Sequence, residues 1–269
     1  MSPCAHQDSW ATTIHCARLI VPANPRNPLI GVATAGFYDR VWSNTSTELD
    51  YTEVARITFI ARGIRDIASS RRLQILDLGC GRGWMAPFLS TFGTITGVDF
   101  SQAGIAFAAE HYGEYGTFHL ANAESSTLGL PSEVRYDVVV CSEVLEHTPD
   151  HDDLLRQIAR FLRREGWCFL TTPNGNVWPR FHVDPRFNAG LQPVENWVSP
   201  TRLRELLAAA GFYVVRHEGR PVYEFRVGAT GCLQHRRIER AFVKLGLASV
   251  YYRTISPTAL YQCVAARKS

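Results

Sequence analysis

The sequence predicts an α/β fold, a doubly wound, seven-stranded and mostly parallel sheet with an N-terminal helical cap and inserted lid segments. From about residue 73 onward, strand-like runs alternate with helix-like runs, as in a sheet covered by helices on both faces. The run over 136–141 is almost entirely apolar, which is typical of a central strand. The strand ending at Leu78 continues into a turn with three glycines, where the backbone can approach a ligand closely.

Local patterns predict the individual elements in order. Strands are expected over residues 74–78, 94–98, 117–121, 136–141, 167–171, 212–217 and 260–266. Ser101 is a natural N-cap for the helix after the second strand, and Ser199 followed by Pro200 marks a later helix start. A helix is expected over about 48–65, and an apolar helical stripe before the fifth strand predicts a helix that Gly166 ends.

Three segments lie outside this alternation. Residues 1–60 precede the first strand, 174–198 follow the fifth, and 220–257 separate the last two. We therefore expect a core over 61–219 and 258–269, with a cap or lid segment before it. The segments 174–198 and 220–257 are expected to be acceptor-binding insertions.

The third of these segments carries a basic helix. Its expected apolar side includes Leu245, and its basic side consists of Arg236, Arg237, Arg240 and Lys244. Two interpretations stay open: a cap helix packed on the core with solvated arginines, or a peripheral contact with a membrane surface or an anionic substrate.

The residues around the glycine turn indicate its ligand. The dinucleotide fingerprint needs a third glycine where this chain has Trp84, and Asp77 would repel a pyrophosphate. An acid at that place suits a cation such as an amino-acid ammonium. Asp99 ends the second strand, where an acid can hold two ribose hydroxyls, and Phe100 offers a flat surface for adenine. Ammonium, ribose and adenine together describe S-adenosylmethionine.

At these residues the chain resembles the class I S-adenosylmethionine-dependent methyltransferases, over roughly residues 73–219. Four motifs occur in order, at 77–83, 99–100, 122–124 and 136–147, and they look like those of bacterial quinone-biosynthesis-like and natural-product O-methyltransferases. The resemblance implies a Rossmann-like fold with S-adenosylmethionine as cofactor. It implies cofactor contacts at Tyr38, Asp77, Gly79, Cys80, Gly81, Gly83, Asp99, Phe100, Asn122, Ala123, Ser142 and Glu143.

The expected catalytic residues are His147, His182 and Glu143, because a hydroxyl acceptor must lose its proton to a base or a Lewis acid. Two interpretations of Glu143, Glu146 and His147 stay open. In the favoured one they shape the cofactor pocket and a hydrogen-bonded turn, and no metal is bound. In the other they bind a divalent cation, as in quinone-biosynthesis and small-RNA 2′-O-methyltransferases. Those relatives have a downstream histidine that this chain lacks, so Glu195 or His182 would have to replace it.

We expect transfer of a methyl group to a hydroxyl of a small molecule, with a phenolic, sugar-like or secondary-metabolite acceptor. Aromatic residues in the insertions favour a ring-shaped acceptor. The alternatives are N- or C-methylation of a small molecule, metal-dependent 2′-O-methylation of RNA, and a non-catalytic protein that binds S-adenosylmethionine.

Composition limits the partners and the location. The net charge of +3 and the pI near 8.5 are modest, so a nucleic-acid partner is not expected. No apolar run approaches the roughly twenty residues of a membrane span, and the first thirty residues do not form a signal peptide. Seven cysteines without a C-x-x-C pair fit reduced thiols, and together these features predict a cytoplasmic location. The oligomeric state is not predicted.

Overall fold

The structure is a computed structural model of the 269-residue chain. It describes residues 36–42, 49–68, 71–122, 130, 133–179, 192–221 and 230–269. The seven strands are β1 (Leu73–Leu78), β2 (Gly93–Asp99), β3 (Gly116–Leu120), β4 (Tyr136–Ser142), β5 (Leu162–Pro173), β6 (Phe212–Arg220) and β7 (Tyr261–Lys268).

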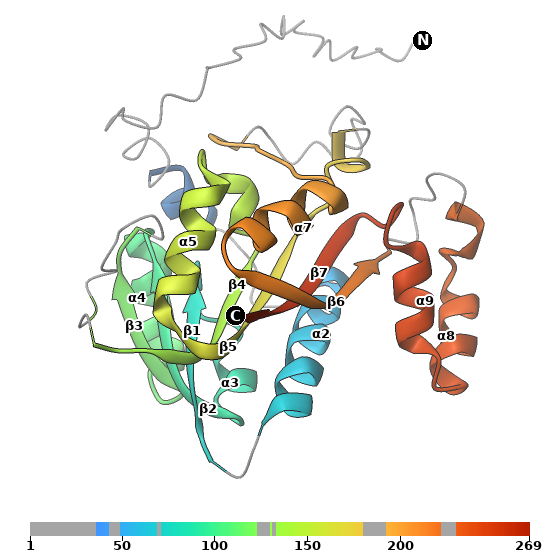
Figure 1. Cartoon of the computed structure of the whole chain (residues 1–269). Coiled ribbons are helices and arrows are strands. Elements are labelled where there is room, and N and C mark those ends of the chain that lie inside the picture. Colours follow the sequence, from blue (N-terminus) through green and yellow to red (C-terminus); the bar gives the residue numbers. More distant parts are fainter. Residues whose placement is uncertain are drawn as a thin grey trace, which may run out of the picture.

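The strands form one sheet in the order β3-β2-β1-β4-β5-β7-β6 (Figure 1). All neighbours pair in parallel except β7, which runs antiparallel to both β5 and β6. The predicted doubly wound, mostly parallel sheet is therefore confirmed. The chain runs outward from β1 to β2 and β3 and then crosses back to β4 on the other side of β1, and ligands of such sheets bind at the carboxyl ends of the strands at this switch point.

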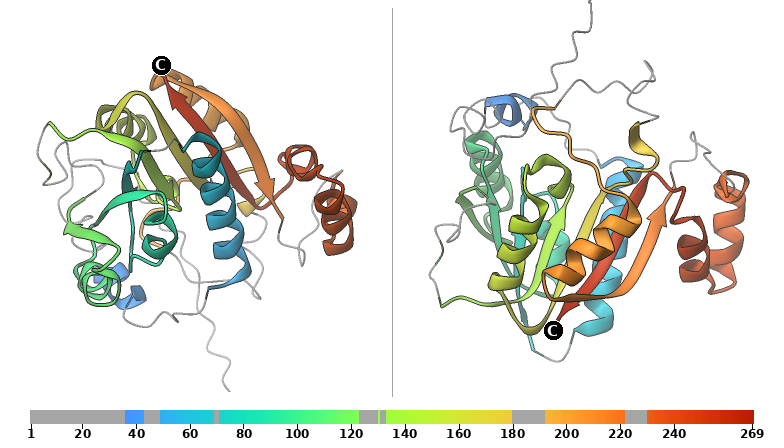
Figure 2. Two further views of the ribbon diagram at one scale, coloured as in Figure 1. Left: turned by 90° about the horizontal axis from the view of Figure 1, so that it is seen from below. Right: turned by 45° about the horizontal axis from the view of Figure 1, so that its top comes forward.

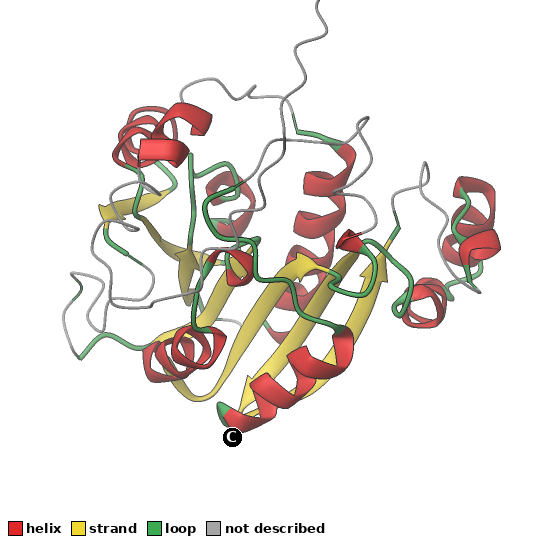
Figure 3. Ribbon diagram, turned by 90° about the horizontal axis from the view of Figure 1, so that it is seen from above, coloured by secondary structure: helices red, strands yellow, loops and turns green. Residues whose placement is uncertain are grey.

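Helices cover both faces of the sheet, and Figure 3 shows the layers from above. On one face lie α2 (Tyr51–Ile67), α3 (Ala86–Leu89) and α4 (Gln102–Tyr112), and on the other lie α5 (His151–Phe161) and α7 (Pro200–Ala209). Successive strand residues alternate between two cores: Ile75 and Val138 face the α2 side, whereas Leu76 and Val139 face the α5 side.

Side-chain caps fix the starts of several helices. The Asp50 carboxylate accepts the Glu53 N–H at 2.7 Å, and the Glu53 carboxylate accepts the Asp50 N–H at 2.8 Å. This capping box begins α2 at Tyr51, a few residues after the expected start. Ser101 and Ser199 cap α4 and α7 as predicted.

Two sequence expectations are wrong. Gly166 does not end a helix: α5 ends at Phe161, and Gly166 lies inside β5, which begins at Leu162. The basic amphipathic helix expected within 220–257 is present as α8 (Arg236–Lys244), which pairs with a second helix, α9 (Ala248–Ile255), but Leu245, expected on its apolar side, is 72% exposed between them. Figure 2 shows this pair beside the outer edge of the sheet, beyond β6.

The α8–α9 hairpin has a small core of its own and is tied to the loop after β5. Tyr251 and Ile255 are buried within it. The buried Asn174 amide lies 2.9 Å from the Ala259 carbonyl oxygen and 3.3 Å from that of Ser256. Within the described residues, no helix is long and apolar enough to cross a membrane.

We predict that Asn174→Ala lowers the free energy of unfolding by roughly 1–3 kcal/mol, because buried carbonyls lose their donor. Asn176→Ala is the matched control, since Asn176 is exposed and is bonded to Asn174 through its backbone N–H. Urea unfolding of both variants measures the difference. Equal stability of the two variants would contradict the anchoring role of Asn174.

Candidate active site

Only glycine can form the turn that follows β1. The angle φ is 77° at Gly79, 52° at Gly81 and 74° at Gly83, in the left-handed region that side chains disfavour. A Cβ at Gly79 would lie 2.2 Å from Val144 Cγ2, and one at Gly81 would lie 2.8 Å from the Trp42 indole. Glycine therefore lets Val144 and Trp42 pack directly against the backbone of this turn, where a side chain would collide with them.

Backbone hydrogen bonds of Cys80 help to hold this turn in its conformation. Its N–H donates to the Val98 carbonyl at 3.0 Å, and its carbonyl accepts the Gly83 N–H at 2.9 Å. The thiol is buried, with Sγ 3.0 Å from where a Cβ on Gly97 would lie, and burial raises its pKa well above the usual value. Because the thiol is buried, we expect Cys80 to contact a ligand through its backbone atoms.

Asp99 holds the turn against the start of α4. Its Oδ2 accepts the Gly81 N–H at 2.9 Å, and its Oδ1 accepts the Ser101 N–H at 2.8 Å. The side chain is buried, and burial raises its pKa despite these bonds. Each carboxylate oxygen has two lone pairs, so both can accept a further hydroxyl.

Asp77 lies near the carboxyl end of β1 and is 4% exposed. Burial raises the pKa of its carboxyl to about 7, and the charge of Asp99 adds to the effect. A cation bound beside Asp77 would favour the ionised form again. A cationic ligand bound beside Asp77 would therefore shift this carboxyl toward its ionised form near neutral pH.

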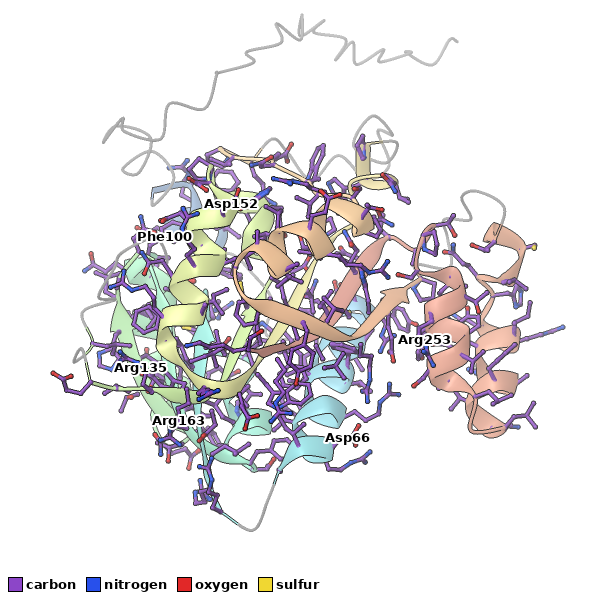
Figure 4. The ribbon with its side chains drawn as sticks, viewed as in Figure 1. Asp66, Phe100, Arg135, Asp152, Arg163 and Arg253 are labelled. Atoms are coloured by element: carbon purple, nitrogen blue, oxygen red, sulfur yellow. The ribbon has the colours of Figure 1, made fainter. Side chains whose placement is uncertain are left out.

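A short helix over residues 36–42 covers the turn. Asp39 Oδ1 accepts the Ser101 hydroxyl at 2.5 Å and the Ala103 N–H at 3.1 Å, which joins this helix to the start of α4. The Tyr38 ring meets the half-buried Phe100 edge-on, with centroids 5.2 Å apart. Figure 4 places Phe100 at the edge of the sheet beside this cap.

Glu143 follows β4 with a φ of 58°, unusual for a residue other than glycine. Its Oε1 accepts the Thr171 hydroxyl at 2.9 Å, and the Thr171 oxygen lies 2.8 Å from Ser142 Oγ. Its Oε2 lies 3.5 Å from Arg56 Nη1 of α2. Burial raises the pKa of Glu143 to about 7, and Arg56 opposes that shift.

Glu146 and His147 lie in the short helix η1 (Leu145–His147). The Glu146 carboxylate is buried, accepts the Thr172 hydroxyl at 2.8 Å, and lies 3.5 Å from His147 Nε2. His147 Nδ1 lies 3.1 Å from the Val194 carbonyl, which only an N–H can satisfy. Burial raises the pKa of Glu146 to about 7 and lowers that of His147, so the neutral imidazole has its Nε2 lone pair available.

Tyr38, in the short helix over residues 36–42, lies close to His147 of the Glu146–His147 pair. Its ring centroid lies 5.8 Å from that of His147, and its hydroxyl donates to Gln192 Oε1 at 2.5 Å. Asn122 is exposed just after β3. Ala123 and His182, which were expected at the site, lie outside the described residues.

The sequence profile of a family described as a methyltransferase domain matches residues 52–217. The chain belongs to the class I S-adenosylmethionine-dependent methyltransferases. A ubiquinone biosynthesis O-methyltransferase of Thiobacillus denitrificans is 36% identical to this methyltransferase over 108 residues, 39% of this chain and 46% of that protein. One of Hydrogenovibrio crunogenus is 28% identical over 167 residues, 58% and 68% of the two chains. The chain spans about half the length of most curated relatives it matches.

Solved structures share the fold of this methyltransferase. The magnesium protoporphyrin IX methyltransferase of Synechocystis, crystallised with S-adenosylmethionine, superposes with a TM-score of 0.56 at 14% identity, covering 89% of this chain and 97% of that one. The [4+2]-cyclase SpnF superposes with a TM-score of 0.57 at 19% identity, covering 87% and 94%. At these identities the likeness concerns the fold alone.

The residues of this methyltransferase fit its cofactor. The glycine turn exposes backbone without side chains, and the acids Asp77 and Asp99 lie at the ends of β1 and β2 next to it. An ammonium suits the first acid and ribose hydroxyls suit the second. The described residues contain no group of three or more His, Cys, Asp or Glu arranged to hold a metal ion. Instead, Arg56 faces Glu143, and Thr172 donates to Glu146.

Two residues of the site were not found from the sequence. Asp39 is 62 residues from the Ser101 hydroxyl it accepts, and Arg56 is distant from Glu143 in the chain. The aromatic residues around Tyr38 indicated a cap in the sequence, but no sequence pattern distinguished Asp39 in the same segment as a site residue. An arginine in an amphipathic helix is ordinarily a solvated residue, so Arg56 had no distinguishing pattern.

We predict that Asp99→Ala weakens the binding of S-adenosylhomocysteine by roughly 1.5–3 kcal/mol, about 10- to 150-fold, because a charged hydrogen bond is lost. Calorimetry measures the dissociation constant. Glu110→Ala, an exposed acid of α4, serves as the control and should leave it unchanged. An unchanged constant in Asp99→Ala would refute the ribose assignment.

We predict that the affinity for S-adenosylmethionine rises with pH between about 6 and 8. The pKa of Asp77 is raised to about 7 in the free protein, so binding of an ammonium beside it releases a proton, which higher pH favours. Asp77→Asn should remove this rise. A wild-type affinity that is independent of pH over this range would contradict the assignment of Asp77.

Proposed function

We propose that this methyltransferase transfers the methyl group of S-adenosylmethionine to a hydroxyl of a small molecule, with a phenolic, sugar-like or secondary-metabolite acceptor. The observation that carries the proposal is the buried Glu146–His147 pair at the carboxyl end of β4, whose imidazole is fixed with Nε2 as an acceptor. A hydroxyl needs such a base, whereas a neutral amine is already nucleophilic. The ubiquinone biosynthesis O-methyltransferases among its relatives support the same reaction class.

Most of the work of the protein is binding and alignment. The sulfonium methyl group of the bound cofactor is already activated, and transfer is an in-line displacement. Asp99 would accept the ribose hydroxyls, Asp77 would pair with the ammonium, and Phe100 would lie against the adenine. The Tyr38 ring, packed on Phe100, would close the cap over this end of the site.

His147 would accept the proton of the acceptor hydroxyl. Its Nδ1–H is held by the Val194 carbonyl, which fixes the tautomer, and the imidazolium that forms would lie 3.5 Å from the Glu146 carboxylate. The opposite charge of Glu146 stabilises that imidazolium. His182 stays a second candidate for the base.

Aromatic residues would supply the acceptor pocket. Trp178 lies between Tyr261 and Trp197, with ring centroids 5.7 and 6.4 Å away, and Arg56 lies over the Tyr261 ring at 5.6 Å. Flat rings of this kind suit a ring-shaped acceptor. The assignment of 174–198 as an acceptor-binding insertion is part of this proposal, and within 220–257 only the chain outside α8 and α9 is included in it, because these helices lie at the sheet edge beyond β6.

The direct test incubates the protein with methyl-labelled S-adenosylmethionine and a panel of catechols, phenols, hydroxylated sugars and matched aryl amines. The proposal expects a labelled methyl ether. Label found on nitrogen or carbon, with hydroxyl acceptors inert, would contradict it. Because SpnF is named a cyclase and shares this fold, the assay has to detect methyl transfer itself.

We predict that His147→Ala lowers the turnover of a hydroxyl acceptor by about 10²–10⁴-fold, the usual contribution of a general base. The wild-type rate should rise with pH to a plateau whose midpoint lies below the ordinary histidine pKa of 6.5, because burial lowers the pKa of His147. His111→Ala, on the surface of α4, is the control. Full activity of His147→Ala with an unaltered pH profile would exclude this base.

A further inference from the structure

The end of the α8–α9 hairpin presents a group of exposed apolar side chains. Val243, Leu245, Leu247 and Val250 are 50%, 72%, 44% and 46% exposed, and they fall within eight consecutive residues. A smaller group, Leu49, Tyr51 and Val54, lies at the start of α2, and the other exposed large apolar side chains of the described chain are more scattered along the sequence. Exposed apolar side chains that lie close together mark an interaction site more often than scattered ones do.

These apolar side chains are not the hairpin's own core. Ile238 and Phe242 of α8 pack against the buried Tyr251 of α9, and the Phe242 and Tyr251 ring centroids lie 5.5 Å apart. Gly246, with a φ of 72°, makes the turn between the helices. The hairpin therefore satisfies its own packing and presents its remaining apolar residues outward.

Basic side chains lie along the two helices that carry this apolar tip. The hairpin, over residues 230–256, contains the basic residues Arg236, Arg237, Arg240, Lys244 and Arg253. Its one acid is Glu239, which accepts the Tyr252 hydroxyl at 2.5 Å. The hairpin thus carries a net charge of +4 within a chain whose total is +3, so the rest of the chain is slightly negative.

The hairpin is fixed to the body of the protein. Arg220 at the end of β6 stacks on Tyr252 of α9, with its guanidinium 3.8 Å from the ring centroid, and donates to the buried Glu218 at 2.9 Å. Figure 1 shows α8 and α9 at the sheet edge beyond β6, and Figure 4 places Arg253 there, far from Phe100. The basic apolar tip is therefore a fixed surface away from the cofactor turn.

We propose that the tip of the α8–α9 hairpin docks on a lipid bilayer that contains anionic phospholipids. Exposed aliphatic side chains at the tip of a basic hairpin match an interface in which apolar chains lie beneath negative headgroups. If a second copy of this protein docked through the same surface, two hairpins that each carry a net charge of +4 would face and repel each other. A nucleic acid would leave the exposed leucines and valines without an apolar partner.

The test is co-sedimentation of the whole protein with vesicles of phosphatidylglycerol and phosphatidylcholine, compared with vesicles of phosphatidylcholine alone. We expect binding to the anionic vesicles that weakens as salt rises from 0.05 to 0.5 M. Arg237→Gln with Arg240→Gln should lower the partition coefficient roughly 25-fold, about fivefold for each charge. Leu245→Ser with Leu247→Ser should also lower it, because less apolar surface is buried.

Matched control variants make the same kinds of substitution on other surfaces of the protein. Val215→Ser removes an apolar side chain of β6 that is 53% exposed, and Arg160→Gln with Arg204→Gln removes two exposed charges of α5 and α7. Neither control should change the partition coefficient. The proposal is overturned by equal binding to both vesicle types, by no binding, or by hairpin variants that match the controls. A hairpin-dependent RNA complex or self-association without lipid binding would overturn it as well.

Discussion

The rest of the site depends on the hydrogen bonds that join the Asp99 carboxylate to the Gly81 and Ser101 N–H groups. They hold the glycine turn after β1 against the start of α4, so one buried acid sets the shape of both elements. The parallel pairing of Leu78 with Val98 brings the ends of β1 and β2 together. A second acid, Asp77, lies on β1 beside the same turn. A ligand bound at this turn would therefore lie beside the side chains of both Asp77 and Asp99.

Contacts between distant segments complete the site around that pair. Asp39 extends the capping of α4 to the helix over 36–42, and Arg56 of α2 reaches Glu143 after β4. Asn174 joins the loop after β5 to the chain between α9 and β7. The sheet therefore supplies the carboxylates, and the added segments close the space above them. Removal of one of these contacts should disturb the site without disrupting the sheet.

The sequence alone was sufficient to predict the features that depend on residues close together in the chain. The central strand β4 has a nearly continuous apolar run, and the Ser101 and Ser199 caps depend on residues only three positions away. Gly166 was misplaced because a glycine after an apolar stripe is as compatible with a strand as with a helix end. Asp39 and Arg56 were missed because their partners are far away in the chain, and a single sequence does not show which distant residues meet.

The most direct test of the central claim is a crystal structure of the protein with S-adenosylhomocysteine. The account predicts both ribose hydroxyls within hydrogen-bonding distance of the Asp99 carboxylate and the ammonium near Asp77. It also predicts the adenine against Phe100. Density for the product elsewhere, or a ribose without contact to Asp99, would contradict the account.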